Sequence, residues 1–426
     1  MIETREGYAP QSPATLAAYL GGIPRVAALL GGAPSGWNIA EVGDGNLNLV
    51  FIVKGPAGGV AVKQALPYVR LVGESWPLPL SRAHYEHMAL SEQARLTGRL
   101  TPEIYHYDET LALIVMELLE PHIIMRRGMI AGIEYPKFAE DISTFMARTL
   151  YFTSDLALTA DKKKAMIAAF AGNTALCKIT EDLIFTDPYR VAPLNRWTSP
   201  QLDAYAAEWR DDGDLKVAVS RLKLKFLSSA EAMLHGDLHT GSIMLTPADT
   251  RVIDPEFAFM GPMGFDAGAV IANFLLNYFS QDGHEKEPGG RDGYREWVLA
   301  TLQQIWVFFR AKFLALWRGD GMGDAYPAAL FEDAEGQSRL EQERQAYMDR
   351  LWTDTVGFAA AKMTRRILGL AHNIDLEWIE DKDRRALCEA RALILSRDMM
   401  VNPGNYASVE ALAEAARRTR RNVLNY

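Results

Sequence analysis

The sequence predicts a two-lobed α+β protein in which a small strand-rich part is followed by a larger helical part. The chain has 426 residues, whereas one hydrophobic core rarely serves more than about 250–300 residues. Apolar runs typical of strands occur before residue 120, and apolar residues recur at helical spacing after it. We therefore expect one lobe over residues 1–118, a second over residues 119–426, and a binding cleft between them.

The first lobe is predicted from short elements punctuated by glycine and proline. Residues 1–36 are expected to cap it with one short helix, and a hairpin is expected at Gly58-Gly59. A later helix has Ser81 available as its N-cap and Gly98 near its end. The expected ranges are a helix at 13–20, strands at 47–53 and 60–64, a helix at 81–99 and a strand at 111–116.

The second lobe is predicted from helical periodicity. Ser199-Pro200 resembles a helix start, with a capping hydroxyl before a proline at the first helical position. Residues 213–229 place apolar side chains on one helix face. Residues 267–278 are apolar nearly all round, which indicates a helix in the centre of the lobe.

Composition limits the function classes. The chain has 49 % hydrophobic and 23 % charged residues, and 45 Lys+Arg against 54 Asp+Glu give a net charge of −9. This balance argues against non-specific binding to nucleic acid or to anionic membranes, which need dense positive charge. Two separate cysteines, Cys177 and Cys388, exclude a disulfide framework and a cysteine-based zinc site. With a polar N-terminus and no apolar stretch long enough to span a bilayer, we expect a cytoplasmic protein.

A glycine turn and a lysine suggest a phosphate site in the first lobe. Gly43-Asp44-Gly45-Asn46 precedes a strand, and its bare backbone could approach phosphate oxygens. A Rossmann motif would be followed by a helix and a Walker A loop would end in GK[ST], so neither motif fits. Lys63 lies in an apolar strand, where a buried ammonium needs an anion, and Glu86 of helix 81–99 offers one.

The strongest chemical signal is His235-Gly-Asp-Leu-His-Thr-Gly-Ser242, followed by Asp254-Pro-Glu256. Asp237 could orient an acceptor hydroxyl and take its proton, while Asp254 and Glu256 could hold Mg²⁺ against triphosphate oxygens. The last two side chains share a face if the backbone is extended, although Pro255 makes a turn equally plausible. His235 and His239 are interpreted as loop-bracing residues; a zinc hydrolase is disfavoured because no HExxH pattern occurs.

Taken together, these residues resemble the protein-kinase-like superfamily, in the small-molecule branch with aminoglycoside and choline kinases. The chain is more specifically similar to the methylthioribose kinase family over roughly residues 37–400. The matching stretches are Glu41-Val-Gly-Asp-Gly-Asn-Leu-Asn48, Gln64-Ala-Leu-Pro-Tyr-Val-Arg70, Gly73-Glu-Ser-Trp-Pro-Leu78, His235 to Ser242, Asp254-Pro-Glu-Phe-Ala258, Gly261-Pro-Met-Gly-Phe-Asp266 and Thr364-Arg-Arg-Ile-Leu-Gly-Leu-Ala-His372.

The resemblance implies a protein-kinase-like fold with an ATP cleft between the lobes and Mg²⁺-dependent phosphorylation of the 1-hydroxyl of S-methyl-5-thioribose, a step of methionine salvage. It also implies a homodimer. For the nucleotide, the resemblance implies that Gly43, Asp44, Gly45 and Asn46 cover the phosphates, that Lys63 paired with Glu86 contacts them, and that the main chain of Glu117 and Leu119 holds adenine below Met116. For the reaction, it implies catalysis by Asp237, metal binding by Asp254 and Glu256, and contacts of Arg365 and Arg366 with the sugar and the transferred phosphate. It also implies that Trp76 approaches the substrate and that Asp266 braces the catalytic loop.

One departure from the wider superfamily lies in the catalytic loop, where Ser242 stands in place of the usual asparagine. A hydroxyl reaches less far than an amide, so the metal is assigned chiefly to Asp254 and Glu256. Two alternatives stay open: a kinase for another neutral alcohol such as 5-deoxyribose, and a nucleotide-binding pseudokinase. Choline and aminoglycosides are disfavoured because Arg365 and Arg366 would repel a cationic acceptor.

Overall fold

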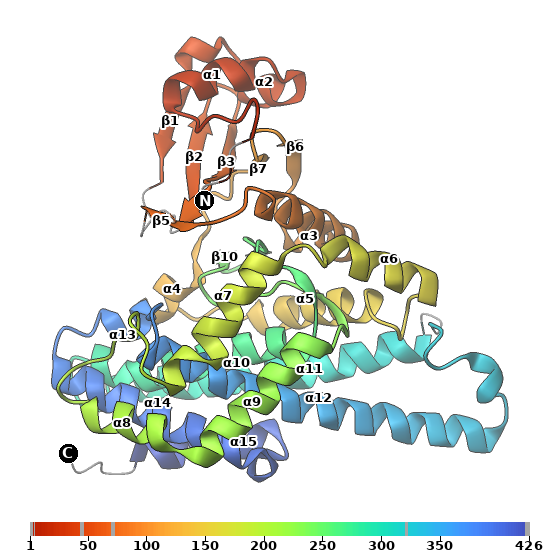
Figure 1. The fold of residues 1–426 in the computed structure, drawn as a ribbon, viewed down its shortest axis with the longest axis vertical. Helices are drawn as coiled ribbons and strands as arrows, with labels where there is room; N and C mark the ends of the chain where they lie inside the picture. The colour runs from red at the N-terminus through yellow and green to blue at the C-terminus, as the bar shows by residue number, and fades with distance from the viewer. Residues whose placement is uncertain (1–2, 4, 43–46, 70–72, 320–322, 422–426) are drawn as a thin grey trace.

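The structure is a computed structural model that describes residues 3, 5–42, 47–69, 73–319 and 323–421. It has two regions, a small one built on an antiparallel sheet and a larger one made mainly of helices (Figure 1). The two-lobed α+β architecture predicted from the sequence is confirmed. The predicted glycine turn at 43–46 lies outside the described residues.

The small region is a five-stranded antiparallel sheet in the order β1-β2-β3-β7-β6. Lys63 in β3 pairs with Val50 in β2 and with Ile114 in β7, so it lies on a central strand. A separate two-stranded hairpin, β4-β5, follows β3. The strands are β1 (Asn38–Glu41), β2 (Asn48–Lys54), β3 (Gly59–Ala65), β4 (Tyr68–Val69), β5 (Gly73–Pro77), β6 (Ile104–Asp108) and β7 (Leu113–Glu117).

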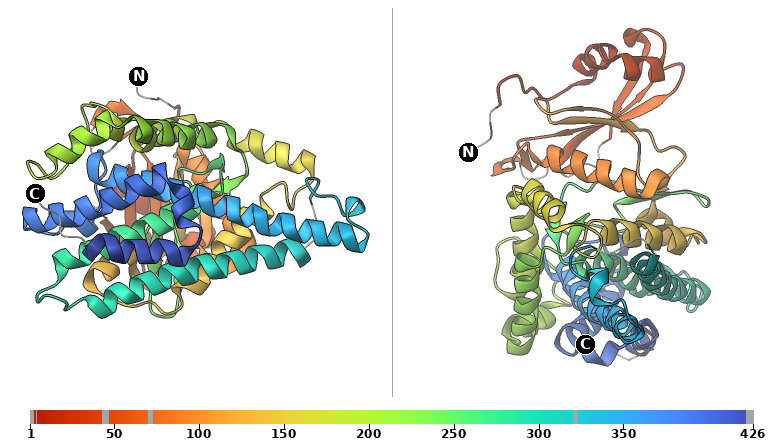
Figure 2. Two further views of the ribbon diagram at one scale, coloured as in Figure 1. Left: turned by 90° about the horizontal axis from the view of Figure 1, so that it is seen from below. Right: turned by 90° about the vertical axis from the view of Figure 1, so that its right-hand side faces the viewer.

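Helices cover this sheet on opposite sides. α1 (Pro13–Gly21) and α2 (Pro24–Leu30) lie at the end remote from the helical region (Figure 2). Buried apolar side chains of both helices pack against β2, β3 and β7. α3 (Arg82–Thr97) runs between the sheet and the helical region. Ser81 occupies its N-cap position without a capping hydrogen bond from its side chain, and Gly98 ends it with a φ of 64°. Because α3 borders both regions, its inward side chains can reach a site between them.

The large region is a helical body with short strands near the small region. The strands form the sheets β11-β10-β8 and β12-β9. Their bounds are β8 (Ile123–Ile124), β9 (Ala232–Leu234), β10 (Ile243–Leu245), β11 (Thr250–Val252) and β12 (Phe259–Gly261). The helices are α4 (Met125–Ala131), α5 (Phe138–Phe152), α6 (Ala160–Phe170), α7 (Thr174–Phe185), α8 (Asp203–Asp211), α9 (Gly213–Ser228), α10 (Gly264–His284), α11 (Asp292–Gly319), α12 (Ala334–Leu368), α13 (Ile374–Glu377), α14 (Lys382–Val401) and α15 (Val409–Arg421).

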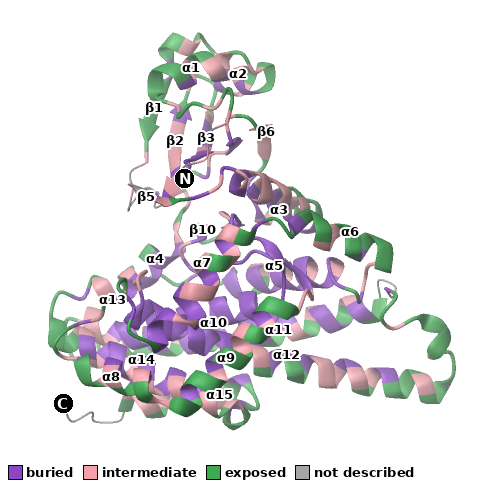
Figure 3. Cartoon of the chain, viewed as in Figure 1, coloured by how far each residue is buried: buried purple, intermediate pink, exposed green. Residues whose placement is uncertain are grey.

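The predicted central helix is confirmed as α10, which is buried continuously from Gly264 to Gln281 (Figure 3). It packs against α12 and α14. At Gly268 the two helices approach so closely that a Cβ atom would lie 2.8 Å from the backbone nitrogen of Ala359 in α12. This close packing fixes the position of α12, whose last turns carry Arg365 and Arg366.

The helix start predicted at Ser199-Pro200 is wrong. These residues lie in turns, in which the N–H of Leu202 donates to the carbonyl of Thr198 and the N–H of Asp203 donates to the carbonyl of Pro200. α8 therefore begins at Asp203 instead.

Among the described residues, no single helix is long and apolar enough to cross a bilayer. Only α1 and α2 reach that length together, across a bend of 110°.

Candidate active site

Lys63 is held by carboxylates from two elements. Its Nζ lies 2.9 Å from the carboxylate of Glu86 in α3 and also contacts the carboxylate of Asp254. The Lys63 side chain is only 11 % exposed. The structure thus supplies both anions that the buried ammonium requires.

Asp254 directly precedes a turn over residues 255–258, in which the N–H of Ala258 donates to the carbonyl of Pro255. The φ of Asp254 is 68°, in the left-handed region, so residues 254–256 are not extended. Glu256 is instead directed at Arg82 and Asn48: its Oε2 accepts from the Nδ2 of Asn48 at 3.0 Å and lies 3.4 Å from the Nε of Arg82. The turn still keeps the ligand atoms of Glu86, Asp254 and Glu256 within 4.8 Å of one another.

We call this group the carboxylate cluster; it comprises Lys63, Arg82, Glu86, Asp254 and Glu256. Its donor set is compatible with Mg²⁺, which prefers carboxylate oxygens and retains several waters. The Asp254 side chain is 44 % exposed, so it can reach a ligand from solvent.

Burial and neighbouring charges shift the pKa values of Lys63 and Glu86. Burial alone would lower the pKa of Lys63, but the charges of Asp254, Glu86 and Glu256 outweigh it and raise that pKa. Burial raises the pKa of Glu86; the charge of Lys63 opposes this rise, and the like charges of Asp254 and Glu256 add to it. Lys63 therefore stays charged and can face a further anion.

The catalytic loop that follows β9 is braced from α10. Asp266 accepts hydrogen bonds from the backbone nitrogens of His235 and Gly236, at 2.6 and 3.0 Å. Gly236 has a φ of 83°, and a Cβ there would lie 2.1 Å from the carbonyl oxygen of Phe257. The geometry agrees with the bracing role that the resemblance implies for Asp266, and it explains why the loop needs glycine at 236.

Hydrogen bonds join this loop to the segment that carries Asp254. The Nε2 of His235 donates to the carbonyl of Ile253 at 2.9 Å, and the N–H of Ile253 donates to the carbonyl of Ser242 at 3.0 Å. Asp237 and the carboxylate cluster therefore face one region, and the charge of Asp237 contributes to the pKa of Asp254.

Asp237 is surrounded by donors. Its Oδ1 lies 3.2 Å from the Nζ of Lys362 and 4.0 Å from the Nη2 of Arg366, and its Oδ2 lies 3.1 Å from the Nε2 of His239. Burial would raise the pKa of this carboxyl, but His239, Lys362 and Arg366 hold it well below its usual range. Asp237 is therefore ionised at neutral pH and can accept a hydrogen bond from a hydroxyl.

Arg365 and Arg366 occupy the last turn of α12, and both are buried. The Nη1 of each donates to the carbonyl of Ala371 at 3.2 Å. The Nε of Arg365 has no hydrogen-bond partner among the described residues. Arg126 of α4 lies close enough to interact electrostatically with this pair, and it contacts Thr240 at 3.1 Å and Asp375 at 3.3 Å.

We call this second group the cation cluster. It comprises Arg126, Lys362, Arg365 and Arg366 together with Asp237 and Asp375. Four cations against two carboxylates leave it positive, although the whole chain has a net charge of −9. A local positive field of this kind suits an anionic phosphoryl group.

The segment predicted to hold adenine joins the two regions. Met116 and Leu119 are buried. The side chain of Glu117 accepts from Arg251 in β11 at 2.8 Å, so its carboxylate is anchored to the large region. The backbone N–H of Glu117 donates to the carbonyl of Glu103 at 2.8 Å.

Trp76 lies on β5 and belongs to neither cluster. It is partly buried against Val69, Leu78 and Leu176, in an apolar cluster that also includes Phe257 beside Glu256. The structure therefore places Trp76 between the two regions near the carboxylate cluster.

Four residues of the two clusters were not predicted from the sequence: Arg82, Arg126, Lys362 and Asp375. All four are charged residues in helices and are buried. The only signal for Lys362 was its position one turn before Arg366, on the same helix face.

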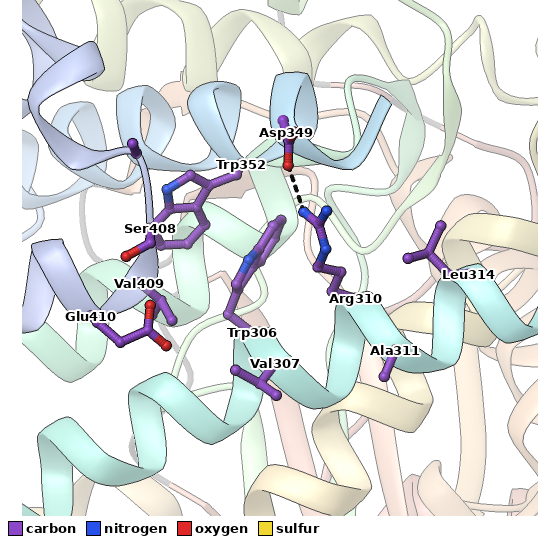
Figure 4. Close-up of a pocket in the computed structure, with 11 residues that line it drawn as sticks. Trp306, Val307, Arg310, Ala311, Leu314, Asp349, Trp352, Ser408, Val409 and Glu410 are labelled. Atoms are coloured by element: carbon purple, nitrogen blue, oxygen red, sulfur yellow. Dashed lines mark hydrogen bonds and ion pairs between the residues drawn. The ribbon is translucent and has the colours of Figure 1, made fainter. Parts of the chain in front are cut away.

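Two surface cavities lie away from these clusters. The first, of about 490 Å³, lies between α11, α12 and the start of α15 and is lined by Trp306, Trp352 and the Arg310–Asp349 ion pair (Figure 4). The second, of about 670 Å³, is lined by charged residues including Arg384 and Arg420. Neither is lined by a predicted site residue.

Comparison with known proteins identifies the family to which the chain belongs. Residues 38–297 match the phosphotransferase enzyme family. Methylthioribose kinase 2 of Oryza sativa subsp. japonica is 46 % identical over 411 residues, 96 % of each chain. The methylthioribose kinase of Escherichia coli O45:K1 (strain S88 / ExPEC) is 46 % identical over 96 % of this chain and 98 % of that one.

Solved structures are more distant. A glucosamine kinase in complex with glucosamine, ADP and inorganic phosphate is 14 % identical, with a TM-score of 0.45 over 90 % of this chain and 84 % of that one. The family match and the full-length similarity agree with the kinase-like fold and the enzyme class predicted from the sequence. The chain therefore belongs to the phosphotransferase enzyme family and, within it, to the methylthioribose kinases.

Proposed function

We propose that the protein transfers the γ-phosphoryl group of ATP to the 1-hydroxyl of S-methyl-5-thioribose and forms the 1-phosphate. The observation that carries this proposal is the placement of Asp237, an ionised carboxylate held beside Lys362 and Arg366 in a loop joined to the carboxylate cluster. The names of relatives that are 46 % identical over nearly the whole chain support the substrate.

The nucleotide binds on the side of the carboxylate cluster. Lys63, fixed by Glu86, contacts the phosphates, and Gly43, Asp44, Gly45 and Asn46 cover them. The main chain of Glu117 and Leu119 holds adenine, with Met116 at the back of the pocket. The ion pair from the Glu117 side chain to Arg251 supports this role, because it steadies the connecting segment without using its backbone groups.

Asp254 and Glu256 would hold Mg²⁺. When bound, the ion neutralises charge on the triphosphate oxygens. Asp254 is the more accessible ligand, whereas Glu256 is held by Asn48 and Arg82 and is positioned in advance. The Ser242 hydroxyl lies 3.3 Å from the Nδ1 of His239, so it supports the catalytic loop in this structure.

The acceptor binds on the side of the cation cluster. Asp237 accepts the hydrogen bond of the 1-hydroxyl and takes its proton as the phosphoryl group transfers. Arg365 and Arg366 stabilise the charge on that group, which planar guanidinium groups contact in a bidentate manner. Trp76 approaches the substrate from β5, and apolar side chains around it suit a thioether tail.

A kinetic panel tests the proposal. Purified protein with ATP and Mg²⁺ would be offered S-methyl-5-thioribose, 5-deoxyribose, homoserine, choline and an aminoglycoside, and the phosphorylated carbon would be identified by NMR. We expect the highest kcat/KM for the thiosugar and phosphate on C1. A preference for another acceptor would support the neutral-alcohol alternative, and ATP binding without transfer to any acceptor would support the pseudokinase.

We further propose that the enzyme acts in methionine salvage in the cytoplasm, that it is a homodimer, and that its lobes comprise residues 1–118 and 119–426. The resemblance to methylthioribose kinases supports these points. Sedimentation equilibrium of the full chain tests the dimer, for which a mass near twice 47.4 kDa is expected.

A further inference from the structure

Lys362 is a charged residue in a buried location, where desolvation of its ammonium group costs free energy. It is 3 % exposed and lies in α12, one turn before Arg366. Its ammonium lies over the ring of Phe265, 4.1 Å from the centroid. Burial, together with the like charges of Arg365 and Arg366, lowers its pKa to about 8. A methionine would fill this space without that penalty, so the charge itself needs an explanation.

The contact with Asp237 supplies that explanation. The Nζ of Lys362 is 3.2 Å from the Oδ1 of Asp237, within hydrogen-bond distance. The nearest atom of Arg366 is 4.0 Å away from the same oxygen. Lys362 is therefore the closest cation to this oxygen among the described residues.

The second oxygen of Asp237 is held from its own loop. The Nδ1 of His239 accepts from the backbone nitrogen of Gly241 at 3.0 Å, so the proton of the neutral ring lies on Nε2. Nε2 then donates to the Oδ2 of Asp237. Burial lowers the pKa of His239 to about 3, so this ring is neutral at pH 7.

Two donors from two elements therefore fix the plane of the Asp237 carboxylate. A carboxylate oxygen accepts more than one hydrogen bond, so each oxygen retains capacity for an acceptor hydroxyl. Rotation of the carboxylate about its Cβ–Cγ bond would break the contact from α12 or the contact from the loop. Removal of Lys362 would release one side of this restraint.

We propose that Lys362 is a positioning residue that holds the Asp237 carboxylate in the orientation that receives the acceptor hydroxyl. The inference rests on the proposed role of Asp237. Lys362 acts through that carboxylate and needs no contact with the substrate. The end of α12 therefore carries both the lysine that positions Asp237 and the arginines proposed to bind the phosphoryl group.

The first experiment compares Lys362→Met with the unchanged full-length enzyme. Turnover is expected to fall about 10- to 100-fold, as for supporting residues of metal and catalytic groups, while KM for ATP stays within about twofold. The acid limb of the kcat/KM profile is expected to move to higher pH, because loss of an adjacent cation makes Asp237 easier to protonate. The charged and titratable groups facing this pair are His235, His239, Arg126, Asp254, Asp266, Arg365 and Arg366.

Lys163→Met is the matched control. Lys163 is also a buried lysine, but its Nζ donates to the backbone carbonyls of Thr153 and Glu231. Its replacement should lower stability without moving the acid limb. An equal loss of turnover in both variants, with neither profile shifted, would overturn the proposal.

A double-mutant cycle separates a role through Asp237 from a general structural role. Asp237→Asn/Lys362→Met should be no slower than Asp237→Asn alone, because the restrained carboxylate is already absent. Multiplied losses in the double variant would overturn the inference. If Lys362→Met does not fold, Lys362→Gln retains a donor, and it should be slower than the unchanged enzyme but lose no further activity once Asp237 is replaced.

The failures are distinguishable. If Asp237→Asn is fully active, the proposed function of Asp237 fails whatever Lys362 does. If Asp237→Asn is inactive and Lys362→Met equals the unchanged enzyme in turnover and pH profile, only the inference about Lys362 fails.

Discussion

The carboxylate cluster and the cation cluster have opposite character. The first, proposed to face the nucleotide, has three carboxylates against two cations. The second, proposed to face the acceptor, has four cations against two carboxylates. An acid-rich site suits a divalent cation, whereas a cation-rich site suits a phosphoryl group. The difference supports the proposal that the metal–triphosphate complex binds at the first cluster and that the guanidinium groups of the second stabilise the transferred phosphoryl group.

The largest effect should follow from replacement of Asp237, the carboxylate of the cation cluster that is proposed to take the proton of the acceptor hydroxyl. Asp237→Asn is expected to lower turnover about 10²- to 10⁴-fold, as for the loss of a general base, while ATP affinity changes little. Single-turnover rates and a separate nucleotide-binding titration measure the two quantities. Turnover within threefold of the unchanged enzyme would remove Asp237 from the chemistry.

Replacement of Arg82 in the carboxylate cluster should lower the free energy of unfolding. Arg82 is 0 % exposed, and it donates to the backbone carbonyls of Leu66 and Leu47 and to Asn48 beside Glu256. Arg82→Met leaves Glu256 buried without this cation, which typically costs about 3–5 kcal/mol in the free energy of unfolding. Urea unfolding measures it. The exposed pair Lys178–Asp182 is the control, because Lys178→Ala should cost less than about 1 kcal/mol.

Replacement of an arginine in the cation cluster should give a smaller catalytic effect. Arg366→Lys is expected to lower kcat about 10- to 100-fold, because a point charge does not reproduce a planar fork. KM for ATP should stay nearly constant. Arg365→Lys, made in parallel, shows which arginine contacts the transferred group, and a mild effect in both would contradict the proposed role of the pair.

The smallest effect is expected at the metal. Glu256→Gln should raise the Mg²⁺ concentration needed for half-maximal rate about 10-fold, because one carboxylate charge is lost while Asn48 and Arg82 remain in place. Rate measurements over a Mg²⁺ series test this. Asp254→Asn should raise that concentration further, since its side chain is the more accessible ligand.

Local patterns were sufficient to predict much of this arrangement. The strand alternation around Lys63, the apolar character of α10 and the motifs from His235 to Glu256 predicted their elements, because each depends on neighbours in the sequence. The helix start predicted at Ser199-Pro200 was wrong, because the prediction used only local residue types and did not include the turn in which the N–H groups of Leu202 and Asp203 are hydrogen-bonded.

Long-range pairing accounts for what the sequence did not predict. Lys362 meets Asp237 across 125 positions of the chain, and Asn48 meets Glu256 across 208. A charged residue in a helix is usually exposed to solvent, so nothing local indicated that Arg82 and Lys362 would be buried. Only the packing of α3 and α12 against their neighbours brings these charges to the site.

The carbonyl of Ala371 receives a hydrogen bond from each of the two neighbouring arginines. A main-chain oxygen is present whatever side chain residue 371 carries, so this anchor tolerates sequence drift at that position. It is sensitive instead to insertions, deletions or prolines that alter the course of residues 369–373. Substitutions at residue 371 itself should therefore leave the anchor intact, whereas Asn373, which is buried and caps α13, should not tolerate replacement.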